Sequence, residues 1–406
     1  MNISGNARKD FLWNIVGTGC TAFTLTIILF MTIRINGVEE AGSVSLAFSL
    51  SLIFFPVGLY GGRFYQVTDV KNEFEDNVYI LLRFMTTMFM PMLCGVFVLF
   101  GNYGKLTNRL LIFFTLIKMS ESISDAFYGI IQKRNEFYII GISFFYRFII
   151  GVGLFVVINF VTYDISLAVL GMLFANFTCM VFYDFRKARY CVKWLFSRGM
   201  IEQLKKLAGK GFYLAIFSFI PILTINIPRF FLINIDDQAY LSIFNMPNTI
   251  FYMLVMLIMI NPTLVHMSNS IQNNEAGVTK TIKRLILVVC GFTALSLILA
   301  YYIGTQILTI VFGIDFAGYR SVLLMSIING ALLGTVNIFV SVLNIMRRFI
   351  QEMTIYIICV FILLLFSVLT VGRYGLIAAI TALLVYNATT LLLFGFCSLK
   401  NLRRRE

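Results

Sequence analysis

The chain has 406 residues, of which 59% are hydrophobic and only 13% are charged, and its mean hydropathy is +0.89. A soluble domain is about half apolar and about a quarter charged, so this composition excludes an ordinary soluble protein. The net charge of +13 does not indicate nucleic-acid binding, because the basic residues lie in short segments between long apolar runs.

Twelve apolar runs are long enough to cross a membrane, since a spanning helix needs roughly 20 apolar residues. Lipid offers no partner for free backbone groups, so these runs must be helical. The sequence therefore predicts an all-α, polytopic integral membrane protein. Its expected spans are 11–33, 41–60, 79–100, 110–131, 138–160, 165–183, 211–233, 241–262, 285–303, 319–343, 353–372 and 375–397.

The distribution of basic residues predicts the orientation of the chain. Most of the 32 lysines and arginines fall in alternate gaps between the spans. The opposite gaps hold only Arg34, Lys105, Arg109, Arg320 and Arg373. Cytoplasmic loops are enriched in Lys and Arg, so we expect both termini and the longest loop to lie in the cytoplasm.

The longest loop, roughly 184–210, is basic and partly amphipathic, as in a helix lying on anionic lipid. It predicts an N-terminal six-helix lobe (1–185), a basic cytoplasmic linker (186–210) and a C-terminal six-helix lobe (211–406). A faint repeat supports this duplication. The first span is followed by Asn36-Gly-Val-Glu-Glu-Ala41, and the corresponding place in the second half holds Asn234-Ile-Asp-Asp-Gln-Ala239.

Catalytic and metal motifs are missing from the sequence. The seven cysteines form no CxxC pair, and His266, in a predicted cytoplasmic loop, is the single histidine. This argues against a disulfide framework, a multi-histidine metal site and a histidine-based catalytic centre. Since there is also no P-loop, HExxH or GxSxG motif, we expect a protein that is not an enzyme.

Ionisable side chains within the predicted spans are the strongest functional signal, because a charge at mid-bilayer is costly. Lys118, Glu121 and Asp125 are spaced by three and four residues, which puts them on one helix face. Arg147 lies on the next span, where an antiparallel hairpin places it at a depth between the two carboxylates. The sequence predicts an ion pair between them. It leaves open whether these charges form a site or only hold the two spans together.

Other polar residues have weaker signals. Arg229 lies past the middle of its span, with Asn226 three residues earlier. It needs a carboxylate, water or an anionic ligand, unless it snorkels to the interface. Arg63 and Arg83 lie near span ends and can reach lipid headgroups. Asn14, near the cytoplasmic edge of the first span, is a candidate for lining a cavity.

Three segments carry a family resemblance. The first is Asp125-Ala-Phe-Tyr-Gly129-Ile-Ile-Gln132-Lys-Arg-Asn, followed by Ser143 and Arg147. The others are Arg8-Lys-Asp-Phe-Leu-Trp-Asn14 and Asn226-Ile-Pro-Arg229, near the starts of the two halves. With the six-plus-six layout, the chain resembles over essentially its full length the polysaccharide-transporter family. These are Wzx-like oligosaccharide flippases of the MOP superfamily, related to MATE exporters and lipid II flippases.

The resemblance implies two six-helix lobes in a V around a cavity that opens alternately to each side. The implied function is translocation of a polyprenyl-pyrophosphate-linked oligosaccharide across the bacterial cytoplasmic membrane, for surface polysaccharides such as O-antigen. No cofactor is implied beyond coupling to H+ or Na+. The implied partners are the lipid-linked oligosaccharide, membrane lipids and glycan polymerase machinery. Cavity cations would hold the pyrophosphate, and the candidates are Arg229, Arg147, Lys118 and Arg63, with Glu121 and Asp125 as pairing or ion-coupling groups and Asn14 and Asn226 as polar lining.

Two other classes compete with this interpretation. A MATE-like exporter of cationic drugs would favour an acidic cavity, whereas the candidate residues carry a cationic excess that suits an anionic cargo. A membrane enzyme such as a glycan polymerase or acyltransferase needs polar catalytic loops on one face, and the outer loops are short.

Overall fold

The structure is a computed structural model that describes residues 4–69, 73–101, 103–134, 136–189, 199–254, 277–346 and 348–403. The regular structure of these residues is entirely helical, as the sequence predicts. His266 and the end of the eighth predicted span lie outside the described residues. The chain divides into two compact units, Met1–Leu223 (unit 1) and Thr224–Glu406 (unit 2). The division into lobes at a 186–210 linker stays a prediction.

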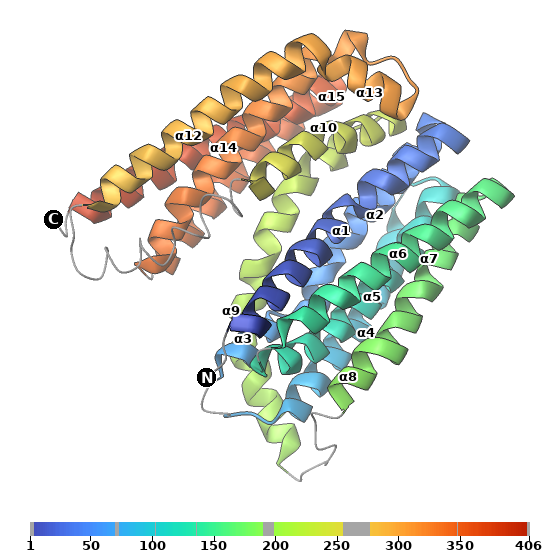
Figure 1. Cartoon of the computed structure of the whole chain (residues 1–406), viewed down its shortest axis with the longest axis vertical. Helices are drawn as coiled ribbons and strands as arrows, with labels where there is room; N and C mark the ends of the chain where they lie inside the picture. Colours follow the sequence, from blue (N-terminus) through green and yellow to red (C-terminus); the bar gives the residue numbers. More distant parts are fainter. Residues whose placement is uncertain are drawn as a thin grey trace. The chain divides into compact units, whose positions relative to one another are not determined.

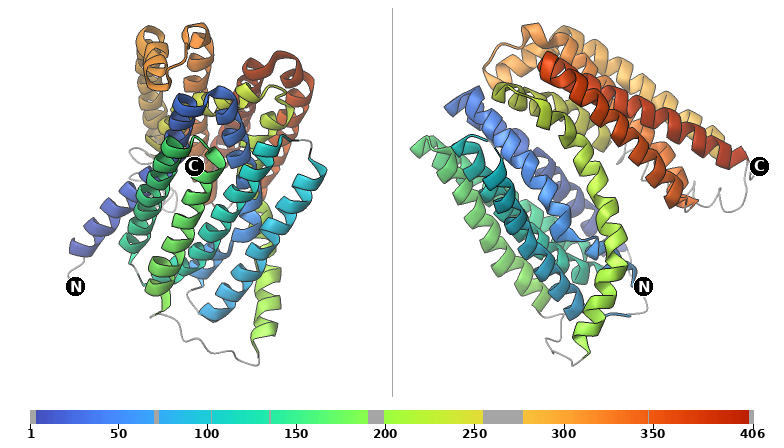
Figure 2. Two further views of the ribbon diagram at one scale, coloured as in Figure 1. Left: turned by 90° about the vertical axis from the view of Figure 1, so that its right-hand side faces the viewer. Right: turned by 180° about the vertical axis from the view of Figure 1, so that it is seen from behind.

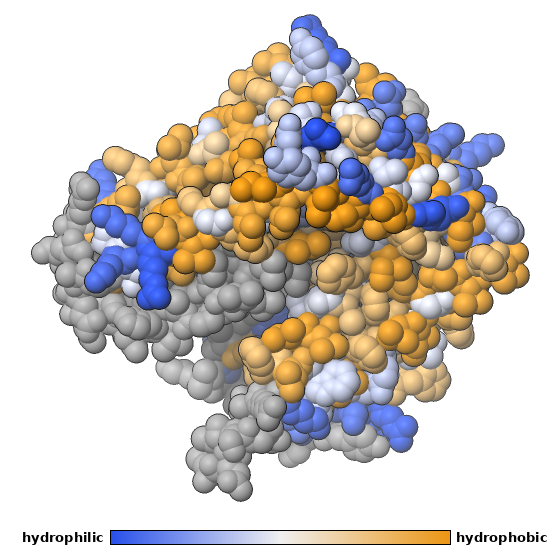
Figure 3. Space-filling view, turned by 45° about the horizontal axis from the view of Figure 1, so that its top comes forward, coloured by the Kyte–Doolittle hydropathy of each residue, from blue (hydrophilic) through white to orange (hydrophobic). Residues whose placement is uncertain are grey.

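Within the described residues, eight helical segments are long and apolar enough to cross a membrane. The last of them covers both of the final two predicted spans. Hydrophobic residues also cover much of the visible surface in Figure 3, with hydrophilic residues gathered in patches. The protein is therefore a multi-pass membrane protein.

Unit 1 is a bundle of long helices that run side by side (Figures 1 and 2). Its elements are α1 (Ser4–Asn36), α2 (Val38–Leu59), the short α3 (Gly62–Thr68), α4 (Asp76–Phe100), α5 (Lys105–Lys133), α6 (Phe137–Thr162), α7 (Ile165–Cys179), a π-helical segment η1 (Met180–Phe185), α8 (Arg186–Arg189) and most of α9 (Met200–Asn226).

Small residues allow the helices of unit 1 to approach closely, as is common in membrane bundles. A Cβ atom on Gly17 of α1 would lie 2.5 Å from the carbonyl oxygen of Gly141 on α6, so α1 and α6 pack backbone against backbone. Ser120, Ser122 and Ser124 of α5 are fully buried. Their small hydroxyl side chains let neighbouring helices pack against α5 and supply hydrogen bonds between helices.

The turn between α1 and α2 is tied to the turn between α6 and α7. The Asn36 side chain donates to the Tyr163 carbonyl (3.0 Å) and accepts from the Asn159 amide (2.8 Å). Asp164 caps the start of α7 by accepting from the backbone N–H of Ser166 (2.7 Å). The first copy of the faint repeat therefore closes one end of the unit 1 bundle.

Unit 2 consists of a second set of long helices, with α12, α14 and α15 running alongside one another (Figure 1). Its elements are the 3-10 turn η2 (Ile227–Phe231), α10 (Ile235–Leu254), α12 (Gly277–Leu299), the π-helical segment η4 (Ala300–Gly304), α13 (Thr305–Phe312), η5 (Ala317–Tyr319), α14 (Arg320–Ile345) and α15 (Phe349–Arg403).

A glycine break divides α15 into the two final spans that the sequence predicts. Gly375 has φ 56° and ψ −133°, a conformation that costs other residues about 1–3 kcal/mol. A Cβ atom there would also lie 2.8 Å from the carboxylate of Asp237, at the start of α10. Asp237 accepts a hydrogen bond from the backbone N–H of Leu376, directly after the break. The second copy of the repeat thus holds a turn in unit 2 as the first copy does in unit 1.

Candidate functional site

A charged cavity of about 290 Å³ lies inside unit 1, among α1, α2, α5, α6 and α7. The four ionisable residues predicted on the fourth and fifth spans, Lys118, Glu121, Asp125 and Arg147, all line it. Aromatic and amide side chains complete the wall, among them Phe55, Tyr128, Phe144, Phe148 and Asn176. The spacing of Lys118, Glu121 and Asp125 therefore did predict a shared face of α5. The other predicted cavity residues, Arg63, Arg229, Asn14 and Asn226, are not among the residues that line this cavity.

Lys118 and Glu121 form an ion pair along one turn of α5. The Lys118 ammonium donates to Glu121 Oε2 over 2.8 Å. It also lies 5.2 Å and 5.5 Å from the ring centroids of Phe48 and Phe55 on α2, which is cation–π distance. The Glu121 side chain remains 27% exposed, whereas that of Lys118 is 9% exposed. The carboxylate is thus the more accessible member of the pair.

Asp125 binds two arginines from different elements. Arg63, in the first turn of α3, lies 3.2 Å from one carboxylate oxygen, and Arg83 of α4 lies 3.0 Å from the other. Arg63 also donates to the Gln132 side chain over 3.0 Å. The expectation that Arg83 reaches lipid headgroups is wrong, because Arg83 is 3% exposed and donates to Asp125 and to the Gly58 carbonyl.

The predicted pairing of Arg147 with Glu121 or Asp125 is also wrong. Arg147 forms its ion pair with Asp184 over 2.8 Å. The sequence places Asp184 at the start of the basic cytoplasmic loop. In the structure, however, α7 continues as η1, and this keeps Asp184 fully buried beside α5 and α6.

Neutral groups complete the surroundings of this ion pair. Arg147 also donates to the Asn176 side chain (3.1 Å) and to the hydroxyls of Ser120 and Ser124. Tyr128 donates to Asp184 (3.3 Å), and its hydroxyl lies 2.7 Å from that of Ser143. Arg147 and Asp184 thus belong to one buried network that ties α5, α6 and α7 together.

Arg229 is buried in unit 2, at the junction between α9 and α10. It donates to the backbone carbonyl (3.3 Å) and side-chain oxygen (3.2 Å) of Gln238, and to the Ser242 hydroxyl (2.7 Å). The Gln238 amide in turn donates to the Arg229 carbonyl over 2.9 Å. Arg229 is 4% exposed, so snorkelling to the interface does not describe it.

The two predicted polar lining residues differ in exposure. Asn14 is exposed on α1, and Asn226 is buried at the end of α9. Their roles stay predictions, as does the substrate-binding role of each cation. The residues that sequence reasoning missed are Asp184 and Arg83. A single sequence gave no direct signal for either, because their burial follows from a helix extension and a long-range contact.

The charged residues that line the cavity balance, with Lys118 and Arg147 against Glu121 and Asp125. A cationic excess appears when the ion-pair partners beside the lining, Arg63, Arg83 and Asp184, are included. Arg63, Arg83, Lys118 and Arg147 contact three carboxylates, those of Asp125, Glu121 and Asp184. The surplus cation lies at Asp125, where one carboxylate serves two guanidinium groups. Among the described residues there is no group of three or more His, Cys, Asp or Glu that could hold a metal ion.

The described residues thus form a helical membrane fold with a charged cavity inside one bundle. No protein-family model matches the chain. It is 24% identical over 388 residues to the capsular polysaccharide biosynthesis protein CapF of Staphylococcus aureus, covering 91% of this chain and 94% of that protein. This similarity, with the fold, confirms the predicted resemblance to polysaccharide transporters of the MOP superfamily.

Two solved structures illustrate the fold. The inward closed lipid II flippase MurJ has a TM-score of 0.72 at 16% identity, over 94% of this chain and 87% of that one. A mutant of the Vibrio cholerae MATE transporter VcmN has a TM-score of 0.63 at 14% identity, over 99% and 98% of the two chains. The similar proteins thus include both a flippase and a MATE transporter.

Proposed function

We propose that the protein flips a polyprenyl-diphosphate-linked oligosaccharide across the bacterial cytoplasmic membrane by alternating access, with both termini in the cytoplasm. The observation that carries the proposal is the cationic excess of the ion-pair network at the unit 1 cavity, in which four cations contact three carboxylates, two of which line the cavity. A diphosphate complements such an excess. The similarity to a capsular polysaccharide biosynthesis protein supports the proposal. Flipping requires no bond to be made or broken, so the protein acts as a transporter and not as an enzyme.

Arg63 is the cation that we assign to the diphosphate. It shares Asp125 with Arg83, and its side chain is 29% exposed where that of Arg83 is 3% exposed. Arg63 can therefore turn to an anion while Arg83 keeps Asp125 neutralised. A guanidinium also offers two parallel donors that match the oxygens of a phosphate. Arg147, whose donors already engage Asp184, Asn176 and two serines, instead holds the wall of the cavity.

Glu121 is the group that we assign to coupling with H+ or Na+. Its carboxylate is accessible, and its partner Lys118 lines the same cavity. When Glu121 binds a cation, Lys118 loses its counter-ion and becomes available to the anionic substrate. Cation binding and substrate binding would then favour each other, which is the linkage that coupled transport needs.

The test is transport by the purified full chain in vesicles that contain a lipid-linked oligosaccharide diphosphate. We expect Arg63→Ala to lower the initial rate about tenfold, the effect of losing about 1.4 kcal/mol of substrate interaction. Lys133→Ala is the matched control, because it also removes a cation from an ion pair (3.1 Å), but its partner Asp76 does not line the cavity, whereas Asp125, the partner of Arg63, does. Equal rates for Arg63→Ala and the wild type would refute the assignment.

An exporter of cationic drugs, as the likeness to a MATE transporter would allow, predicts a different pattern. In that case Glu121→Gln would abolish efflux of a cationic dye, while Arg63→Ala would leave it intact or raise it. Running both variants with both cargoes separates the two functions.

A further inference from the structure

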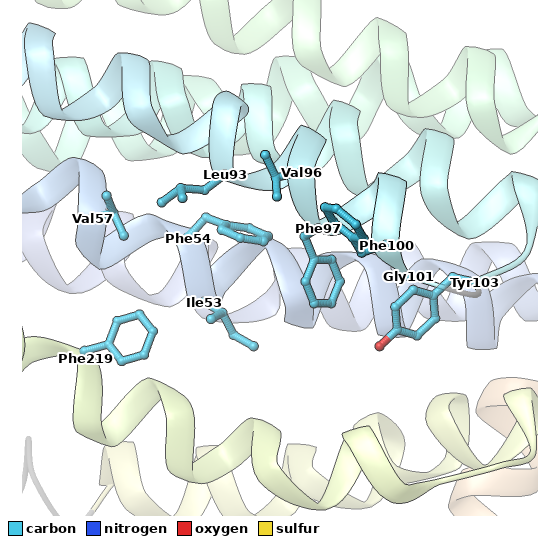
Figure 4. A pocket seen from close by; sticks show the side chains of 10 residues that line it. All are labelled: Ile53, Phe54, Val57, Leu93, Val96, Phe97, Phe100, Gly101, Tyr103 and Phe219. Carbon is cyan, nitrogen blue, oxygen red and sulfur yellow. The ribbon is translucent and has the colours of Figure 1, made fainter.

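A second hollow in unit 1, of about 690 Å³, is lined by apolar side chains of α2, α4 and α9 (Figure 4). Leu93, Val96 and Phe97 of α4 lie across from Phe54 of α2, and Tyr103 lies at one end of the hollow. We call this hollow the apolar groove. Its volume is within the range of ligand pockets, roughly 300–1,000 Å³.

Aromatic rings give the apolar groove a preformed wall. The rings of Phe54 and Phe97 meet edge to face at 5.8 Å, and Phe97 stacks on Tyr103 at 5.7 Å. Such ring pairs favour a defined geometry over free rotation. Other lining side chains remain accessible, since Leu93 is 44% exposed and Val96 is 52% exposed. The groove thus has a wall of defined geometry and remains accessible to a ligand.

The lining excludes water and polar ligands as occupants. Among the described lining residues, only Tyr103 carries a polar side-chain atom. A bound water needs two to four polar partners, which this surface does not offer. The groove is lined mainly by α2 and α4, both of which are long and apolar enough to cross the membrane. The groove therefore suits a hydrocarbon chain.

Helix α2 connects the apolar groove to the charged cavity. Phe54 lines the groove, whereas its neighbour Phe55 lines the cavity and lies beside the Lys118 ammonium. Consecutive residues of a helix point about 100° apart, so one turn of α2 presents a face to each site. A single amphiphile with an anionic head and a long hydrocarbon chain would satisfy both faces.

We propose that the apolar groove binds the isoprenoid chain of the lipid-linked substrate; this rests on the proposed function. Each isoprene unit contains a planar, methyl-substituted double bond that can lie flat against the face of one aromatic ring, and Phe54, Phe97 and Tyr103 offer several such rings to successive units. A saturated acyl chain has no such flat unit. The groove thus selects the carrier chain, while the cavity selects the diphosphate.

The test compares transport of two substrates that share a diphosphate-linked saccharide but carry a long or a short isoprenoid chain. The wild type is expected to favour the long chain. Val96→Trp fills the groove and is expected to lower long-chain transport about tenfold, a loss of about 1.4 kcal/mol, while short-chain transport stays unchanged. Leu99→Trp is the matched control, since Leu99 lies on the same helix, is 82% exposed and does not line the groove. Equal losses for both chains, or no loss, would overturn the proposal.

A second measurement needs neither transport nor a bulky variant. A photoreactive benzophenone amino acid is placed at Val96 or at Leu99 in the full chain, and adducts are identified by mass spectrometry after illumination with the long-chain substrate in mixed phospholipid micelles. An isoprenoid adduct at Val96 exceeding that at Leu99 supports the proposal, and a phospholipid adduct alone refutes it. If the wild type transports neither substrate, the proposed function fails, but the adduct at Val96 still decides the groove.

Discussion

Among the described residues, unit 1 buries Arg83 and Arg147 and unit 2 buries Arg229. Arg147 and Arg229 are stabilised in different ways. Arg147 of unit 1 forms an ion pair with Asp184 and receives further help from Asn176 and two serines. Arg229 of unit 2 donates to the neutral oxygens of Gln238 and Ser242. A buried ion pair depends on both members, because removing one leaves an uncompensated charge. The charge of Arg229 is instead stabilised by several neutral acceptors, so removing any one of them should destabilise the protein less than breaking the ion pair.

This difference also bears on where a substrate can bind. The guanidinium of Arg147 is held by neighbours on α5, on α7 and on η1, the continuation of α7, and therefore fixes the shape of the cavity. Arg63 shares the Asp125 carboxylate with Arg83, so its positive charge is only partly neutralised and can attract an anion. A buried charge in a transporter is thus not by itself evidence for ligand binding, and its partners must be counted first.

Removing the carboxylate of Asp184 should have the largest effect on stability. We expect Asp184→Ala to destabilise the protein by about 3–5 kcal/mol, because Arg147 stays buried without its counter-ion. The measurement is the melting temperature and the monodisperse yield of the purified protein in detergent. The double variant Arg147→Met, Asp184→Leu should recover most of the loss, since no charge remains. If Asp184→Ala and the wild type have the same melting temperature, the ion pair is not what neutralises Arg147.

Truncating Gln238 should have an intermediate effect. Gln238→Ala removes a side-chain acceptor from Arg229 and the donor to the Arg229 carbonyl, and hydrogen bonds to charged groups contribute about 1.5–3 kcal/mol. Gln238→Glu makes unit 2 resemble unit 1 and should be more stable than Gln238→Ala, because it supplies a carboxylate. If the alanine variant melts above the glutamate variant, the neutral shell of Arg229 is essential and the comparison between the units fails.

The sequence predicted the helices well, because apolar length and the bias of basic loops are strong local signals. Helical spacing also placed Lys118, Glu121 and Asp125 on one face, and the depth of a hairpin placed Arg147 near them; the four side chains line one cavity. Both arguments need only neighbouring elements. The arguments succeed because a charged side chain on a membrane-spanning helix is costly to expose to lipid and must face the protein interior or a cavity.

The partners of these charges could not be predicted in the same way. Asp184 follows an apolar run and precedes a basic loop, so the sequence gives no sign that η1 carries it into the bundle. Arg83 reaches Asp125 across 42 positions of the chain, a contact that depends on how α4 packs against α5. Which side chains pair between helices that are distant in sequence depends on how the helices pack, and the local pattern of a single sequence does not specify that packing.

The smallest expected effects come from a matched pair of hydroxyl deletions. Ser124 and Ser242 are both buried, and each accepts a hydrogen bond from one guanidinium, Ser124 from Arg147 and Ser242 from Arg229. We expect Ser242→Ala to cost about 1.5 kcal/mol and Ser124→Ala about 0.5 kcal/mol, within the range for single hydrogen bonds. Arg147 keeps its ion pair with Asp184 after the deletion, whereas Arg229 loses the shortest of its hydrogen bonds described above. The two melting temperatures, measured in the same detergent, decide the order. If Ser124→Ala is the more damaging change, the hydroxyls of α5 and not the Asp184 carboxylate are the main support of Arg147.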